Sequence, residues 1–396
     1  MTESSALSVA AGSSHATGAD IRPTAVEVEL AAVVDNARTI AQFTGTRVCA
    51  VVKADAYGHG APMVAAALED AGVVDRFAVS LVEEGLQLRE AGLRAPVLVM
   101  GPSQAGGVDA MVAAGLTPVM SAAADLGELG QVASRRGRAI AVHLKVDTGM
   151  SRIGVQPAEV PAVVERARAC GVRVVGAMTH LADADVDDPA DRDSPTWRQL
   201  AAFEPAIAAM RAAGAPIEVV HAANSSGAML FPPARGGMVR VGLALYGNGS
   251  WATDHGLPQP RRQALRFVTR IVQLRRVEAG ARIGYGGLYT TTRPSVLGVL
   301  PVGYADGLPR RVTGHGQVIV AGRRCPTLGA VSMDMVVVDV TDLPGVAIGD
   351  VAVVLGSGRG RYGQDHIAVA ELAAWTGLTE YEVTCGISKR VPRLAT

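Results

Sequence analysis

The chain has 396 residues, more than one hydrophobic core usually organises, so we expect a domain of about 200 to 250 residues and a smaller second one. Its 37 Lys+Arg balance 37 Asp+Glu, which argues against a nucleic-acid partner and favours a small-molecule ligand. No apolar run reaches the roughly 18 residues of a membrane span, so we expect no membrane segment.

Cysteine usage and the N-terminal residues predict a cytoplasmic protein. The four cysteines have no CxxC or other metal-ligand spacing, so we expect free thiols and no metal site. The start of the chain lacks the basic and apolar regions of a signal peptide. It is rich in Ser, Ala and Gly and cannot bury enough apolar surface to offset its chain entropy. Residues 1–22 are therefore predicted to be a flexible extension, and no function is assigned to them.

From Pro23 to about residue 247, short β-branched runs alternate with longer stretches of helical periodicity, a pattern typical of βα units around a parallel sheet. Strands are expected at 47–53, 76–80, 96–100, 117–121, 140–147, 174–180, 218–223 and 238–242. Helices, each followed by a glycine suited to end it, are expected at 31–44, 61–71, 81–91, 108–114, 124–136, 157–170 and 196–213. Eight strands and no GxGxxG after the first one favour a (β/α)8 barrel over an open doubly wound sheet.

The sequence changes character after the last of these strands. The polar stretch 248–263 contains Gly and Pro and predicts a linker. Beyond it, short β-branched runs are separated by Gly, Pro and Asp turns, with one helical segment at 366–376. We therefore expect three parts: the extension 1–22, a barrel domain 23–260, and a mostly-β C-terminal domain 261–396.

Reactive side chains occur at the predicted carboxyl ends of the barrel strands, where barrel enzymes have their active sites. They are Lys53, Lys145, Asp147, Arg152, His180, His221 and Arg240. Each of them taken singly is explained better by a solvated rim residue or a hydrogen-bonded structural histidine. Their common position at one end of one barrel favours a shared site.

The loop Asn224-Ser225-Ser226-Gly227 follows the seventh predicted strand. Hydroxyls and free N–H groups at the start of a helix bind anions, and barrel enzymes often bind phosphate after strands seven and eight. Taken alone, the loop is explained better by an ordinary helix cap. Together with Lys53 it indicates a phosphorylated carbonyl cofactor held as a Schiff base, for which pyridoxal phosphate is the candidate.

The segment AVVKADAYGHG at 50–60 resembles the pyridoxal-phosphate lysine motif of the alanine racemase family. The resemblance extends from about residue 23 to the C-terminus. Further matching segments are KVDTGMSRIG (145–154), HAANSSG (221–227), GYGGLY (284–289), PVGYADGLPR (301–310), GAVSMDM (329–335) and YEVTCGISKRVPRL (381–394). The resemblance implies a barrel followed by a β domain, a homodimer, and an isomerase that interconverts L- and D-alanine and supplies D-alanine for peptidoglycan.

The resemblance also implies roles for individual residues. Lys53 would carry pyridoxal phosphate and act as one base, and Tyr285 would be the other. The remaining cofactor-binding residues would be Tyr57, Ser225, Gly242 and Tyr381 at the phosphate, Arg240 at the pyridine nitrogen, Arg152 near the phenolic oxygen, and His180, which would support Tyr285. On the substrate side, Arg152 would bind the carboxylate, while Met333 and Tyr304 would come from the partner subunit. Lys145 matches a lysine that family members often carry as a carbamate.

Racemisation removes a proton from one face of a planar carbanion and returns one to the other face, so two opposed groups are needed. Lys53 and Tyr285 belong to different predicted domains, and a head-to-tail dimer would let them approach from opposite sides. A broad-specificity or serine racemase of the same fold remains an alternative. A barrel that only carries pyridoxal phosphate is a second alternative, but such a carrier needs no second base and no β domain.

Overall fold

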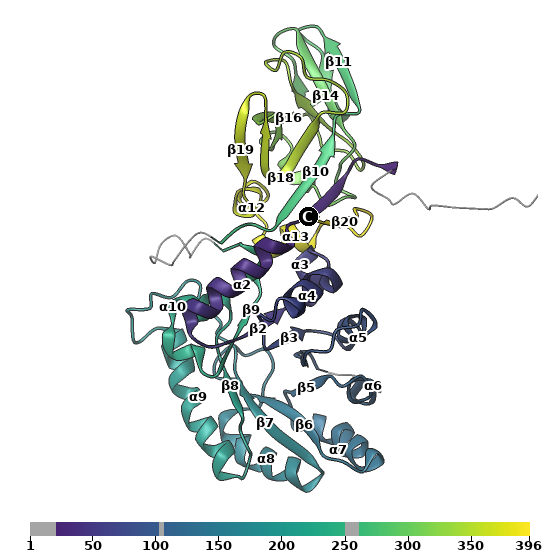
Figure 1. Cartoon of the computed structure of the whole chain (residues 1–396). Helices are drawn as coiled ribbons and strands as arrows, with labels where there is room; N and C mark the ends of the chain where they lie inside the picture. Colours follow the sequence, from purple (N-terminus) through teal and green to yellow (C-terminus); the bar gives the residue numbers. More distant parts are fainter. Residues whose placement is uncertain (1–20, 103–106, 250–260) are drawn as a thin grey trace, which may run out of the picture.

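The computed structural model describes residues 21–102, 107–249 and 261–396, which form a barrel with a β-rich domain beside one end of it (Figure 1). The predicted extension 1–22 lies outside the described residues except for Ile21 and Arg22. Most of the predicted linker 248–263 also lies outside them. Within the described ranges, no helix has the length and apolar character needed to cross a membrane.

Eight parallel strands form the sheet of the barrel, as the sequence predicts. They are β2 (Arg47–Val51), β3 (Arg76–Val79), β4 (Val97–Val99), β5 (Thr117–Met120), β6 (Ile140–Lys145), β7 (Val172–Met178), β8 (Val219–His221) and β9 (Met238–Val241). Their order in the sheet is β8-β7-β6-β5-β4-β3-β2-β9, so the first and last predicted strands lie side by side. The Gly237 N–H donates to the Val220 carbonyl (2.9 Å) across the seam between β8 and β9, which leaves the barrel nearly closed.

The seven predicted helices surround this sheet. They are α2 (Leu30–Thr44), α4 (Ala61–Asp70), α5 (Val82–Glu90), α6 (Gly107–Ala113), α7 (Asp125–Arg136), α8 (Val160–Ala169) and α9 (Pro195–Ala212). Gly45 shows why the predicted glycines end them: its φ of 65° is left-handed, and its N–H donates to the Ala41 carbonyl (3.0 Å). A left-handed turn, labelled α3 (Lys53–Gly58), follows β2, and a short helix, α10 (Ser225–Leu230), follows β8.

The C-terminal domain is mostly β, as predicted. Its strands are β10 (Leu265–Arg270), β11 (Gln273–Val277), β12 (Arg282–Ile283), β13 (Tyr289–Thr290), β14 (Ser295–Leu300), β15 (Gln317–Val320), β16 (Arg323–Leu328), β17 (Val336–Asp339), β18 (Val351–Gly360), β19 (Gly363–Ile367) and β20 (Arg393–Ala395). The expected helix is present as α12 (Val369–Thr376). A further helix, α13 (Glu380–Cys385), was not predicted from the sequence. The reciprocal hydrogen bonds of Thr379 and Glu382 form a capping box, a sequence signal that would have located this helix.

One segment joins a different domain from the one predicted. Residues 25–28, counted with the barrel domain but not predicted as a strand, form β1 (Ala25–Val28), which pairs antiparallel with β10 and parallel with β20 and so belongs to the sheet of the β domain. The alternating sequence VEVE has one apolar face, and the free edge of β10 lets Val26 and Val28 bury that face completely. Arg22, expected in the flexible extension, also bonds to this domain through the Pro301 carbonyl (2.8 Å).

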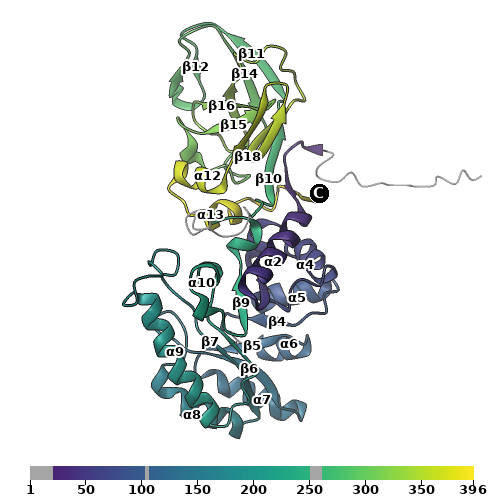
Figure 2. The same ribbon diagram turned by 60° about the vertical axis from the view of Figure 1, so that its left-hand side comes forward.

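The two domains meet at α13 (Figures 1 and 2), which lies against α3. Gly58, in α3, has a φ of +82°, and a Cβ there would lie 2.1 Å from the Thr384 carbonyl oxygen. Only glycine therefore allows α13 to pack this closely on the segment that follows Lys53. This packing holds α13, with Tyr381, over the carboxyl end of the barrel strands.

Candidate active site

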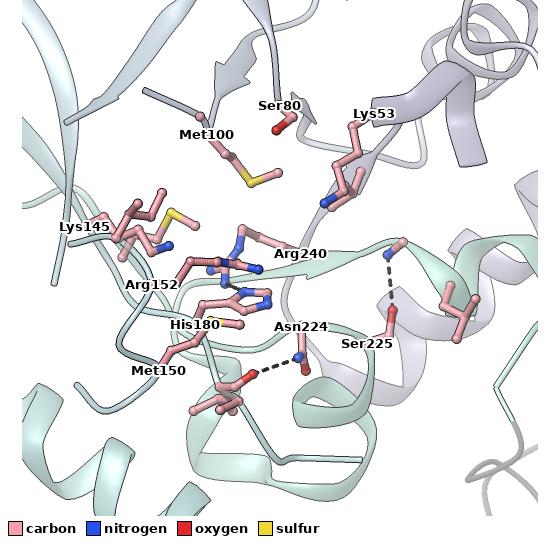
Figure 3. Close-up of a pocket in the computed structure, with 18 of the residues that line it drawn as sticks. Lys53, Ser80, Met100, Lys145, Met150, Arg152, His180, Asn224, Ser225 and Arg240 are labelled. Atoms are coloured by element: carbon pink, nitrogen blue, oxygen red, sulfur yellow. Dashed lines mark hydrogen bonds between the residues drawn. The ribbon is translucent and has the colours of Figure 1, made fainter. Parts of the chain in front are cut away.

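A cavity of about 630 Å³ lies at the carboxyl ends of the barrel strands (Figure 3). Four cationic side chains line it: Lys53, Lys145, Arg152 and Arg240. Among the described lining residues, Asp185 alone carries a carboxylate. The excess of positive charge suits an anionic ligand.

The turn that follows β2, labelled α3, has an unusual backbone. Residues 54–57, none of them glycine, have φ values from 50 to 54°, in the left-handed region that costs about 1–2 kcal/mol per L-residue. The carboxylate of Glu84 stabilises this turn by accepting the N–H groups of Ala54 (2.6 Å) and Ser80 (2.8 Å). The turn aims the amine of Lys53 into the cavity (Figure 3). Sequence reasoning did not single out Glu84, because its partner in this turn, the Ala54 N–H, lies 30 positions away in the chain.

The surroundings of Lys53 favour its free amine. Burial lowers the pKa of this amine, and the neighbouring Arg152 guanidinium lowers it further. A deprotonated amine is the form that attacks a carbonyl or accepts a proton.

Arg240, on β9, determines the protonation of two histidines. This guanidinium is 3% exposed and donates to Nδ1 of His221 (2.9 Å) and Nδ1 of His180 (3.1 Å). Arginine only donates, so each Nδ1 accepts and each neutral ring carries its proton on Nε2. Burial and the Arg240 charge hold the pKa of both imidazoles well below its usual range, which agrees with neutral rings. Among the described residues, Nε2 of His180 has no acceptor and is free to donate to a ligand or partner group.

A third histidine, which the sequence analysis missed, extends this network. Nε2 of His221 donates to Nδ1 of His143 (2.7 Å), which is buried in the barrel. His143 precedes Lys145 by two residues and shares its face of β6, a period-2 signal that could have located it. A Cβ at Gly176 would lie 2.4 Å from the His143 ring, so the adjacent strand makes room for the imidazole.

The lining includes a group of uncharged donors contributed by Tyr57, Ser225, Gly242 and Tyr381. The ring of Tyr57 lies 5.7 Å from that of Tyr381, and a Cβ at Gly242 would meet the Tyr57 hydroxyl at 2.5 Å. The Gly242 N–H donates to Oγ of Ser225 (3.1 Å). Burial raises the pKa of Tyr57, so its hydroxyl keeps its proton as a donor. Hydroxyl and amide donors close together are suited to bind phosphate.

Lys145, at the end of β6, and Arg152, in the loop that follows β6, line the same cavity. Oδ1 of Asp147 accepts three backbone N–H groups of residues 149–151, which orders the loop that leads to Arg152. Lys145 is 4% exposed, and its amine has no hydrogen-bond acceptor among the described residues. Burial, with Arg152, lowers the pKa of Lys145 to about 8.

Three residues expected at the site do not line this cavity. Tyr285 (73% exposed), Met333 (52%) and Tyr304 (43%) lie on the surface of the β domain. The residues that the cavity does bring together are Lys53, Tyr57, Lys145, Arg152, His180, Ser225, Arg240, Gly242 and Tyr381.

The fold and the cavity define a class of protein: a (β/α)8-barrel enzyme with a C-terminal β domain and a cationic cavity into which a lysine amine points. Family models agree with this class. The model described as "Alanine racemase, N-terminal domain" matches residues 28–249, and "Alanine racemase, C-terminal domain" matches residues 264–395.

Individual relatives agree as well. The alanine racemase of Symbiobacterium thermophilum is 44% identical over 380 residues, covering 94% of this chain and 97% of the relative. The crystal structure of alanine racemase from D-cycloserine producing Streptomyces lavendulae is similar with a TM-score of 0.85 and 32% identity, covering 95% and 97% of the two chains. The alanine racemase of Bartonella henselae, solved with covalently bound pyridoxal phosphate, has a TM-score of 0.82 and 28% identity, covering 94% and 99%. The chain belongs to the alanine racemase family, and it is an isomerase.

Proposed function

We propose that the protein interconverts L- and D-alanine in this cavity with bound pyridoxal phosphate, using Lys53 and Tyr285 as opposed bases. The observation that carries the proposal is the amine of Lys53, directed into a cavity whose lining also holds the hydroxyl groups of Tyr57 and Ser225. The alanine racemases among the relatives support alanine as the substrate. The bound pyridoxal phosphate of the Bartonella henselae relative supports the cofactor.

The cavity residues fit this cofactor by their chemistry. Lys53 would hold it covalently, while Tyr57, Ser225, Gly242 and Tyr381 would bind its phosphate. The two terminal nitrogens of Arg240 donate to described acceptors, but its Nε–H does not, which leaves this donor for the pyridine nitrogen. Arg152 would contact the phenolic oxygen. Bound pyridoxal phosphate would withdraw electrons and so make the α-hydrogen of alanine acidic.

In the proposed mechanism, protein groups move protons at opposite faces of the substrate. Nζ of Lys53 takes or returns the α-proton at one face, and Oη of Tyr285 does so at the other. The guanidinium of Arg152 binds the substrate carboxylate and orients the α-carbon between them. The Nε2–H of His180, whose tautomer Arg240 sets, would donate to the Tyr285 oxygen and stabilise its deprotonated form. One proton leaves and one returns in each turnover, so the configuration inverts without net proton uptake.

Tyr285 lies outside the cavity of its own chain, so we propose a head-to-tail homodimer in which the second subunit supplies Tyr285, Tyr304 and Met333. Charge distribution supports this arrangement. Residues 23–249 contain 19 Lys+Arg and 24 Asp+Glu, whereas residues 261–396 contain 17 and 10. Opposite net charges attract when the barrel of one subunit faces the β domain of the other. The large exposed side chains of these three residues are also typical of an interface.

The two-base proposal predicts that Tyr285→Phe affects the two isomers differently. Loss of the Tyr285 oxygen should stop removal of the α-proton from L-alanine, while Lys53 should still exchange the α-proton of D-alanine with solvent. Deuterium incorporation into each isomer, followed separately in heavy water, measures this. Tyr289→Phe, four residues away, is the matched control and should leave both exchanges intact. Equal loss of exchange from both isomers would mean that Tyr285 has another role.

We also propose that Lys145 carries a carbamate, which would give Arg152 an anionic partner and reduce repulsion in the cationic cavity. Carbon dioxide reacts with a free amine, and the pKa of Lys145 near 8 provides that form at moderate pH. Carbamate occupancy should therefore rise as the pH is raised through about 8 and be lost below it. Carbon-13 NMR after equilibration with labelled bicarbonate should detect one signal, which Lys145→Arg removes and Lys389→Arg retains. A signal that survives Lys145→Arg would contradict the assignment.

The substrate range can be tested by measuring racemisation of L-alanine, L-serine and L-lysine by optical rotation. Conversion of alanine at the highest kcat/KM supports the proposal, a preference for serine supports a serine racemase, and no conversion supports a carrier.

We further propose that D-alanine serves peptidoglycan synthesis, which rescue of a D-alanine auxotroph by the gene would support. The free thiols of the four cysteines support a cytoplasmic location. We also propose that the chain is divided into an extension, a barrel domain and a β domain, with β1 assigned to the β domain.

A further inference from the structure

A buried carboxylate lies beneath the surface loop that carries Tyr304. Asp306 is 0% exposed, and two arginines approach it from opposite ends of the chain. NH2 of Arg22 lies 2.5 Å from its Oδ2, and Nε of Arg390 lies 3.1 Å from its Oδ1. The Gly303 N–H also donates to Oδ2 (2.9 Å). A buried carboxylate of this kind depends on its partners, because removing one of the two arginines leaves its charge only partly compensated.

Arg22 holds this loop at two points. Besides contacting Asp306, its guanidinium donates to the carbonyl of Pro301, through Nε at 3.3 Å and NH2 at 2.8 Å. Pro301 and Asp306 lie on either side of Tyr304 in the sequence. One side chain therefore contacts both ends of the segment that presents the tyrosine, although the Thr24 hydroxyl also donates to the Pro301 carbonyl (2.8 Å).

The same loop positions Met333. The Tyr304 N–H donates to the carbonyl of Ser332 (3.1 Å), and the Ala305 N–H donates to that of Met333 (3.0 Å). Arg390 extends the connection, because its NH2 donates to Oδ1 of Asp334 (2.8 Å). The backbones that carry Tyr304 and Met333 are thus bonded to each other and, through Asp306, to Arg22.

The loop has little space in which to relax. Gly307 has a φ of +110°, and a Cβ there would lie 2.5 Å from Cα of Ile387. The Ser388 N–H donates to the Asp306 carbonyl (3.1 Å). The C-terminal segment therefore packs directly against the loop that Arg22 contacts.

From this geometry we propose that Arg22 is a positioning residue for substrate binding: through Asp306 it sets the place of Tyr304 and Met333, and so acts on the active site of the neighbouring subunit. The inference rests on the proposed function, which gives those two residues to the partner's substrate site. Arg22 does not line the cavity of its own chain. Its effect should therefore cross the subunit interface.

The first test compares Arg22→Ala with the wild-type holoenzyme. KM for alanine should rise about tenfold with a smaller change in kcat, since a loosened loop binds substrate less well while Lys53 and the cofactor are unchanged. Arg22→Lys keeps the charge but not the forked donors, should recover part of the loss, and replaces Arg22→Ala if that variant folds poorly. The matched control is Arg38→Ala, which removes an exposed ion pair with Asp35 (3.1 Å) and should leave KM unchanged. An unchanged KM in both Arg22 variants would overturn the proposal.

The second test uses two hybrid dimers, purified through different tags, with the same changes in different arrangements. In one hybrid, an Arg22→Ala subunit pairs with a Lys53→Ala subunit. Its working cavity belongs to the Arg22→Ala subunit and faces an intact Arg22 loop, so KM should be that of the wild type. In the other hybrid, a subunit with both changes pairs with a wild-type subunit. Its working cavity faces a loop without Arg22, so KM should be raised about tenfold.

A role of Arg22 within its own subunit predicts the reverse pattern, and a general loss of stability predicts equal KM values in the two hybrids. Either result overturns the proposal. Failure of the shared-site proposal would instead be detected by the hybrid of Lys53→Ala with Tyr285→Phe, which leaves Arg22 unchanged in both subunits.

Discussion

Lys53→Ala should abolish racemisation in both directions. The change removes the amine that the turn at 54–57 and Glu84 aim into the cavity, and with it both the covalent attachment of the cofactor and one of the two proton-transfer groups. Proton transfer by a positioned group contributes a factor of about 10²–10⁴, and loss of covalent catalysis adds to this. Conversion of L- to D-alanine and of D- to L-alanine, measured separately, should both fall to background.

The same residue can be identified chemically. The chain has only three lysines, Lys53, Lys145 and Lys389, so reduction of the holoenzyme with borohydride should leave a pyridoxyl group on one of three peptides. We expect it on the peptide that contains Lys53. Lys389→Ala is the matched control and should keep both label and activity. A label on Lys145 or Lys389 would contradict the assignment.

Mixing inactive subunits should restore activity. When Lys53→Ala and Tyr285→Phe subunits exchange at random, about half the dimers are mixed, and each mixed dimer has one site with both groups intact, so roughly a quarter of the wild-type activity should return. This expectation follows from the exposed position of Tyr285 on the β domain, outside the cavity of its own chain.

If both groups acted in one subunit, every site would keep one defect and mixing would restore nothing. Mass spectrometry of differently tagged subunits checks that exchange has taken place. An absence of recovery in an exchanged sample would overturn the shared site. Tyr289→Phe in place of Tyr285→Phe is the control, because that subunit should be active before mixing.

The sequence by itself determined the barrel and most of the cavity lining. Buried parallel strands and the helices that cover them differ in period and in β-branched content, so the pattern located all eight barrel strands to within two residues at each end. Residues at the carboxyl ends of such strands, or in the loops that follow them, share one end of the barrel. For this reason Lys53, Arg152, His180 and Arg240 could be placed together before their contacts were known.

Tertiary structure alone decided features that depend on partners remote in the chain. A period-2 strand at 25–28 is compatible with either domain, and only the free edge of β10 assigns it to the β domain. The strained turn after Lys53 requires Glu84, and the histidine tautomers require the donors of Arg240. Arg22 and Asp306 lie 284 positions apart in the numbering and meet only in the folded chain. Sequence patterns report local conformation and burial, whereas a hydrogen bond or ion pair depends on the position in space of both of its partners.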